Sequence, residues 1–163
     1  MAIELVFWTY LIICIFTDLK YKKVYNIVSF SSIFLGFLLN YLFFGMKGFK
    51  QSLTGAIAGF SILFLFFISG GIGAGDIKFL IAIGSLKGAK FVINGTFYGA
   101  MAAGIFTVVL LIQKKLLFST IKKIFVFLIS LILLQKLIPF ENENSIRLPY
   151  AFFLAIGMII NYV

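Results

Sequence analysis

The sequence predicts an all-α, polytopic membrane helix bundle with about six transmembrane helices and one further helix in the membrane interface. Of the 163 residues, 63% are hydrophobic, and the mean hydropathy is +1.16. A soluble domain of this length needs more polar surface than such a sequence supplies. Apolar runs of about 16–22 residues recur, and each is long enough to cross a hydrocarbon core of about 30 Å. Basic residues gather between these runs.

Polar breaks separate six apolar runs that we expect to be spans. The first run ends at TDLKYKK, the second at GMKGFKQS, the third at GGIGAGD, and the fifth at QKK. The fourth run is short for a span. The first lacks both a basic n-region and a small-x-small cleavage site, so we expect a membrane helix there and not a signal peptide. The runs are residues 3–17, 25–44, 53–69, 77–86, 91–112 and 148–163.

The topology depends on residues 116–140, whose centre is apolar but closely flanked by lysines. If this stretch lies in the interface, ten basic residues face the cytoplasm and four face outside, as the positive-inside rule requires. A seventh span would change the balance to eight against six. We therefore expect six spans, both termini outside, and one membrane domain over residues 1–163.

The composition excludes several classes of function. The net charge of +9 is typical of membrane topology and lipid headgroup contacts here, and we expect no nucleic acid as a partner. There is no histidine, and Cys14 is the one cysteine. An internal disulfide, a zinc site and Ser-His or Cys-His catalysis are therefore excluded. We expect neither a metal nor a cofactor.

Carboxylates are so scarce that candidate residues can be found by elimination. Glu4 lies at the outer end of the first run, and Glu141 and Glu143 lie in a hydrophilic loop where solvation explains them. Asp18 and Asp76 are the only aspartates, and each lies where an apolar run meets a basic boundary. The expected topology puts both on the same membrane face. Ionisable groups at membrane depth are costly and tend to mark function.

Two carboxylates that approach each other can hydrolyse a peptide bond. Like charges in a site of low dielectric do not ionise independently, so one carboxyl keeps its proton. The ionised member takes a proton from water while the protonated member polarises the scissile carbonyl. In the structural alternative, Asp18 flanks its helix or caps the next one, and Asp76 caps a helix starting at Ile77.

A cluster of glycines favours the catalytic interpretation. Gly70, Gly71, Gly73 and Gly75 directly precede Asp76. Glycine permits positive φ angles and close backbone approach. In a membrane, irregular backbone is tolerated only where protein or a water-filled cavity satisfies it. A wet break beside Asp76 is what intramembrane hydrolysis requires, whereas helix packing is the structural alternative.

Three segments together resemble one family. GIGAGDIKFLIAIG (residues 71–84) resembles the GxGD segment of type IV prepilin peptidases, which are aspartyl peptidases related to the archaeal preflagellin peptidases. TDLKYKKVYN (residues 17–26) is similar to that family's first aspartate segment, without its proline. LPYAFFLAIG (residues 148–157) is similar to the start of its last helix. The segments occur in the family's order and span most of the chain.

The resemblance implies roles for particular residues. Asp18 and Asp76 would be the catalytic pair, Gly73 and Gly75 would shape the loop that holds Asp76, and Asn26 would line the site. Lys78 receives no chemical role, because two residues along a helix it would not share a face with Asp76.

The resemblance also implies a reaction. The chain would be a small peptidase of the Tad/Flp-pilus type that removes the basic leader from a prepilin or pseudopilin at the cytoplasmic membrane face. It lacks the cytoplasmic insert and paired cysteines linked to N-methylation in larger members, so we expect no methyltransferase activity. The alternative is a non-catalytic membrane assembly factor or small transporter, which would be expected to place polar groups along several helix interiors.

Overall fold

The computed structural model describes residues 1–68, 72–114 and 150–163, and this part of the chain is helical apart from short connections. The all-α class is therefore confirmed for the described residues. The predicted interfacial stretch, residues 116–140, lies outside them. The helices are α1 (Ala2–Tyr21), α2 (Asn26–Ile68), α3 (Ala74–Lys87), α4 (Ala89–Gln113) and α6 (Tyr150–Tyr162).

Among the described helices, α1, α2 and α4 are long and apolar enough to cross a membrane. α6 is equally apolar in character but shorter. Their outer faces carry large hydrophobic side chains, such as Ile12, Phe34 and Phe97, which are 64%, 66% and 64% exposed. Apolar surface on this scale is typical of a chain that faces lipid.

The chain divides into two compact units, residues 1–103 with 149–163 and residues 104–148. Every contact described below lies within the first of these units. It contains α1, α2, α3, the first half of α4 and α6.

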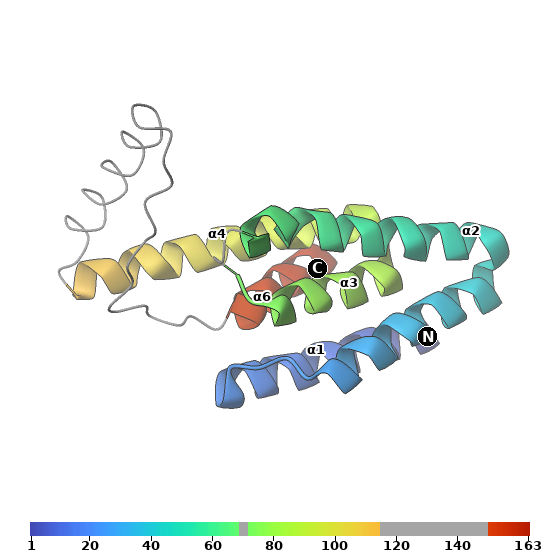
Figure 1. Ribbon diagram of the computed structural model, residues 1–163, viewed down its shortest axis with the longest axis horizontal. Helices are drawn as coiled ribbons and strands as arrows, with labels where there is room; N and C mark the ends of the chain where they lie inside the picture. Colours follow the sequence, from blue (N-terminus) through green and yellow to red (C-terminus); the bar gives the residue numbers. More distant parts are fainter. Residues whose placement is uncertain (69–71, 115–149) are drawn as a thin grey trace, which may run out of the picture. The chain divides into compact units, whose positions relative to one another are not determined.

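α2 reverses direction at Gly45, whose φ of 59° and ψ of −142° are not helical. The hydroxyl of Ser52 donates a hydrogen bond to the carbonyl oxygen of Gly36 at 3.3 Å. In a straight helix these residues would be about 24 Å apart along the axis. The two halves of α2 therefore run back along each other, as Figure 1 shows. The two apolar runs predicted here form two helical halves. The loop predicted at residues 45–52 is wrong, because glycine reverses the chain at one position and residues 46–52 are helical.

α3 is the central helix of the first unit. Both halves of α2 pack along it, and α1 and α6 also contact it. Gly55 of α2 and Gly84 of α3 face each other so closely that a Cβ on either would collide with the other's carbonyl oxygen. Most side chains between Ile77 and Leu86 are buried, which explains why this short helix is apolar on every side.

α6 completes the first unit by packing on α1 and on α4. Backbone atoms of Gly157 lie against Gly95 and Gly99 of α4, where only small residues permit such a close approach. The amide of Asn161 donates to the carbonyl oxygen of Phe91 at 3.3 Å. α1 and α6, the first and last described helices, therefore belong to the same core.

Candidate active site

Asp18 lies within α1 and not after it. The apolar run predicted to end at Thr17 continues as helix to Tyr21, and the Lys22 N–H closes the last turn on the Asp18 carbonyl at 2.9 Å. The Asp18 side chain is only 5% exposed. Its Oδ2 accepts a hydrogen bond from the backbone N–H of Phe152 at 2.9 Å. Asp18 therefore does bond to a helix start, but to that of α6 and not to that of the next helix in sequence.

Asp76 lies in the first turn of α3. The helix begins at Ala74 and not at Ile77, and the N-cap position belongs to Gly73, whose backbone is extended. The Asp76 N–H donates to the Gly73 carbonyl oxygen at 3.1 Å. Asp76 is half-buried. Its carboxylate is thus free of the N-cap role that the structural alternative assigned to it.

The two aspartates come together at one end of the first unit. The Asp18 carboxylate is close enough to Asp76 to act on it electrostatically. One residue arrives near the end of α1 and the other at the start of α3. Two neighbouring carboxyl groups share protons and do not ionise independently. Chemically, such a pair can offer one base and one acid to the same substrate.

The other predicted site residues surround this end of the two helices. Gly73 is exposed, and a Cβ built on it would have the Asp76 carboxylate as its nearest neighbour, at 3.6 Å. Gly75 packs against Val24 in the α1–α2 connection. Asn26 is the first residue of α2. Gly73 therefore directly precedes α3, whereas Gly75 and Asn26 lie in the first turns of α3 and α2.

Sequence reasoning missed two groups near the aspartates. The Lys78 ammonium donates to Asn26 Oδ1 at 2.9 Å and lies over the Phe30 ring at 5.7 Å from its centroid. The second group is the Phe152 N–H. Pro149 in the sequence indicates a helix start nearby, because proline favours the first position of a helix. The first N–H groups of a helix need acceptors outside that helix.

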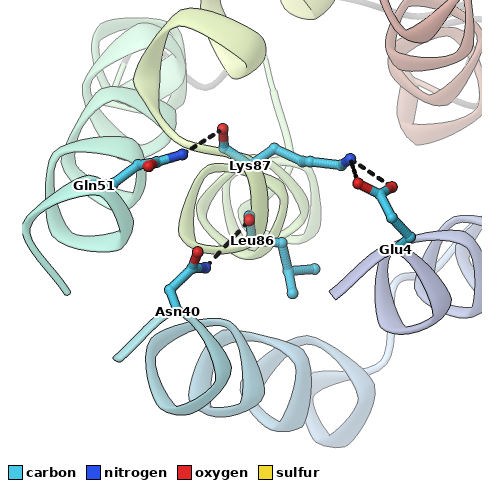
Figure 2. Close-up of polar contacts among 5 residues, drawn as sticks. All are labelled: Glu4, Asn40, Gln51, Leu86 and Lys87. Carbon is cyan, nitrogen blue, oxygen red and sulfur yellow. Dashed lines mark hydrogen bonds and ion pairs between the residues drawn. The ribbon is translucent and has the colours of Figure 1, made fainter. Parts of the chain in front are cut away.

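A second polar cluster lies at the other end of α1 and α3. Figure 2 shows Lys87 of α3 reaching Glu4 of α1, with nitrogen–oxygen distances of 2.5 and 2.6 Å. Glu4 and Asp18 are about 21 Å apart along α1 by the helical rise. α1 and α3 are therefore antiparallel, with the aspartates joining them at one end and the ion pair at the other.

Comparison with known proteins identifies the family. The model of the type IV leader peptidase family (peptidase family A24) matches residues 5–108, which is more than half of the chain and includes both aspartates. The match implies peptidase activity. No curated protein and no solved structure matches the chain significantly. The chain belongs to the type IV leader peptidase family.

Proposed function

We propose that this protein is an intramembrane aspartyl endopeptidase that removes the basic leader of type IV prepilin-like substrates at the cytoplasmic membrane face. Asp18 and Asp76 form its catalytic pair. The observation that carries this proposal is that two aspartates from separate helices lie near enough to interact electrostatically. These are the only aspartates in the sequence, and the family match covers both.

The surroundings of Asp76 suit a peptide substrate. Peptide hydrolysis needs an extended segment to approach the carboxyl groups closely, together with a water molecule. Gly73 is exposed and extended. Among the described residues, a Cβ at Gly73 would have only ordinary contacts, with Asp76 Oδ2 at 3.6 Å and the Gly75 nitrogen at 4.0 Å. Gly75 lets α3 begin against Val24. We assign both glycines the role of shaping the entry to the pair, and Asn26 the role of lining it.

The charge distribution supports the orientation. Lys20, Lys22 and Lys23 follow Asp18 closely in the sequence. Under the positive-inside rule this cluster faces the cytoplasm, and the aspartates face it too. The protein then crosses the membrane six times as a multi-pass protein of the inner or plasma membrane, with both termini outside.

The proposed orientation and the family match are compatible with a prepilin-like substrate. A prepilin or pseudopilin carries a short basic leader followed by a hydrophobic helix. The helix can enter the bilayer beside the exposed apolar faces of the bundle, which places the leader junction at the level of the aspartates. We assign the substrate to the Tad/Flp-type pilus and secretion systems as part of this proposal. The carboxyl pair works without metal or cofactor, and we propose no methyltransferase activity.

The test is co-expression with a candidate prepilin of the Tad/Flp class, with leader removal scored by the mobility of the pilin on a gel. Asp18→Asn and Asp76→Asn are each expected to abolish cleavage while the protein remains inserted in the membrane. Glu4→Gln is the matched control, because it neutralises the other acid of α1 at the far end of the helix. Cleavage per inserted molecule should survive in that control. Cleavage that persists in either aspartate variant would reject the catalytic pair.

A further inference from the structure

The carboxylate of Asp18 faces the first turn of α6. Its Oδ2 accepts the Phe152 N–H at 2.9 Å, and the Ala151 N–H makes a second contact with the same carboxylate. The first N–H groups of a helix have no carbonyl partner within that helix, and they concentrate positive potential at its start. The first turn of α6 contains no acidic or basic side chain. The backbone alone therefore presents positive potential to Asp18.

Asp76 has no comparable support from a neighbouring helix. Among the described residues, no group donates a hydrogen bond to its carboxylate within 3.5 Å. It has a weaker backbone contact with Gly73, in the connection that leads into its own helix. Both aspartates lie near a helix start, since Asp76 is in the first turn of α3. The difference between them is the direct hydrogen bond that only Asp18 receives.

We propose that the first turn of α6 holds Asp18 as the ionised member of the pair, so that Asp18 is the general base and Asp76 the general acid. A buried carboxylate is stable in its charged form only if donors replace the lost water. Asp18 is buried and has such donors. Phe152 is thus a positioning residue that acts through its backbone N–H. The division of roles rests on the proposed function, whereas the order of ionisation does not.

The proton transfers balance in this assignment. Asp18 takes a proton from water as the water oxygen bonds to the scissile carbonyl carbon, and Asp76 gives its proton to the carbonyl oxygen. The carbon–nitrogen bond then breaks. The leaving nitrogen takes the proton from Asp18, and Asp76 recovers a proton from a hydroxyl of the tetrahedral intermediate. Both carboxyl groups return to their starting states, and one water is consumed.

Within the described residues, few charged groups lie near Asp18. α3 contributes Asp76, which interacts electrostatically with Asp18. α1 itself is followed by Lys22, whose positive charge favours it. α2 begins with Asn26, which is occupied by the ammonium of Lys78. The described first turn of α6 contributes no charged side chain. Removing the Phe152 N–H therefore takes one hydrogen bond from the Asp18 carboxylate but leaves the formal charges around it unchanged.

The two aspartates make a direct measurement possible. Carbon-13 labelling of aspartate gives one side-chain carboxyl signal each for Asp18 and Asp76 in an NMR spectrum of the full chain in lipid bilayers. The chemical shift of that carbon reports ionisation, and Asp18→Asn and Asp76→Asn assign the two signals. In the unmodified protein we expect Asp18 to ionise at a lower pH than Asp76. The opposite order would overturn the proposal without any substitution at α6.

Phe152→Pro tests the role of the N–H itself. Proline removes the backbone donor and is tolerated in the first turn of a helix. The ionisation midpoint of Asp18 should rise by about one pH unit, the size expected for a hydrogen bond to a charged group. Phe152→Ala removes the ring, keeps the N–H and is the matched control, so its Asp18 midpoint should stay. A folded Phe152→Pro protein with an unchanged midpoint would also overturn the proposal.

A pH–rate profile separates this proposal from the proposed function. If a prepilin is cleaved, the acidic limb of the profile should move to higher pH in Phe152→Pro and stay in place in Phe152→Ala. If no prepilin is cleaved by the unmodified protein, the proposed function fails while the NMR titration still decides which aspartate is ionised. If Phe152→Pro does not fold, the NMR titration of the unmodified protein tests the proposal by itself, through the order in which Asp18 and Asp76 ionise.

Discussion

Lys87 and Glu4 form an ion pair that joins the last turn of α3 to the first turn of α1, with distances of 2.5 and 2.6 Å. The Lys87 ammonium also lies over the rings of Tyr162, Phe7 and Phe91, at 4.6, 4.8 and 5.6 Å from their centroids. Its side chain is 13% exposed, whereas that of Glu4 is 43% exposed. One cation therefore holds α1, α3, α4 and α6 together at the end opposite the aspartates.

This asymmetry predicts unequal effects of neutralising the two partners. Glu4→Gln should lower stability by at most about 1 kcal/mol, because the carboxylate is well solvated. Lys87→Met should cost about 1–3 kcal/mol, because it removes the ion pair together with three cation–π contacts. Unfolding in mild detergent can be followed through Trp8, the only tryptophan, which packs on Tyr162. Equal losses in the two variants would contradict the role given to the aromatic rings.

Asn40 is predicted to be the most costly polar side chain to remove from α2. Its amide is 2% exposed and donates to the carbonyl oxygens of Gly36, Ser85 and Leu86 at 2.9, 3.1 and 3.2 Å. Carbonyl groups in the last turn of a helix lack hydrogen-bond partners within that helix. The Asn40 amide supplies a donor for two such carbonyls at the end of α3. Asn40→Leu should cost about 1–3 kcal/mol because buried carbonyls lose their donor.

Gln51 provides the matched control for Asn40. It also donates to the end of α3, at the Lys87 carbonyl oxygen, but at 3.4 Å and in an exposed position (Figure 2). Water can replace this bond, so Gln51→Leu should change the free energy of unfolding by less than about 0.5 kcal/mol. The same detergent unfolding assay compares the two variants. A larger loss from Gln51→Leu than from Asn40→Leu would reject this ranking.

The contact between Gly55 and Gly84 predicts that neither position accepts alanine. A methyl group at Gly84 would meet the carbonyl oxygen of Gly55, and backbone on both sides cannot move aside cheaply. Gly84→Ala should therefore cost about 1–3 kcal/mol by overpacking. Gly104→Ala is the control, because a Cβ there has nothing within 4 Å and should be neutral or slightly stabilising in a helix. Thermal aggregation in detergent would rank the two variants.

Lys78 and Asn26 should act as one unit in cleavage. Their hydrogen bond ties the start of α2 to α3, at a position two residues after Asp76. Lys78→Met and Asn26→Ala are each expected to slow cleavage by up to about tenfold, or about 1.4 kcal/mol. The double variant should be no slower than the slower single variant, because both remove the same contact. Lys50→Met, at an exposed position of α2, should leave the rate unchanged. Additive losses would show that the two residues act separately.

The sequence sufficed for the helical class and for the choice of Asp18 and Asp76, because apolar runs and scarce carboxylates are local signals. Their catalytic role stays a prediction. The boundaries were less accurate. Polar residues such as Asp18 and Lys20 were read as the end of a helix, yet the backbone stays helical until Lys22 adopts a left-handed conformation. The polar stretch at residues 45–52 predicts a loop for the same reason, although only Gly45 leaves the helix.

Local sequence patterns do not predict contacts between residues that are far apart in the chain. The expected topology places Glu4 at the outer end of its run, but it does not predict Lys87 as its partner. The bond between Asp18 and the N–H of Phe152 joins positions 134 residues apart, and a backbone group carries no side-chain signature. Lys78 was set aside because it does not share a helix face with Asp76, whereas its partner Asn26 belongs to another helix.

The bond between Asp18 and α6 has a consequence for biosynthesis. The ribosome makes α1 first and α6 last among the described helices. A nascent chain that has inserted α1 to α4 already holds both aspartates, but the donor that completes the environment of Asp18 has not yet been translated. If Asp18 has the proposed catalytic role, its environment is complete only after synthesis has passed Phe152, so a partly made chain would not yet cleave peptides.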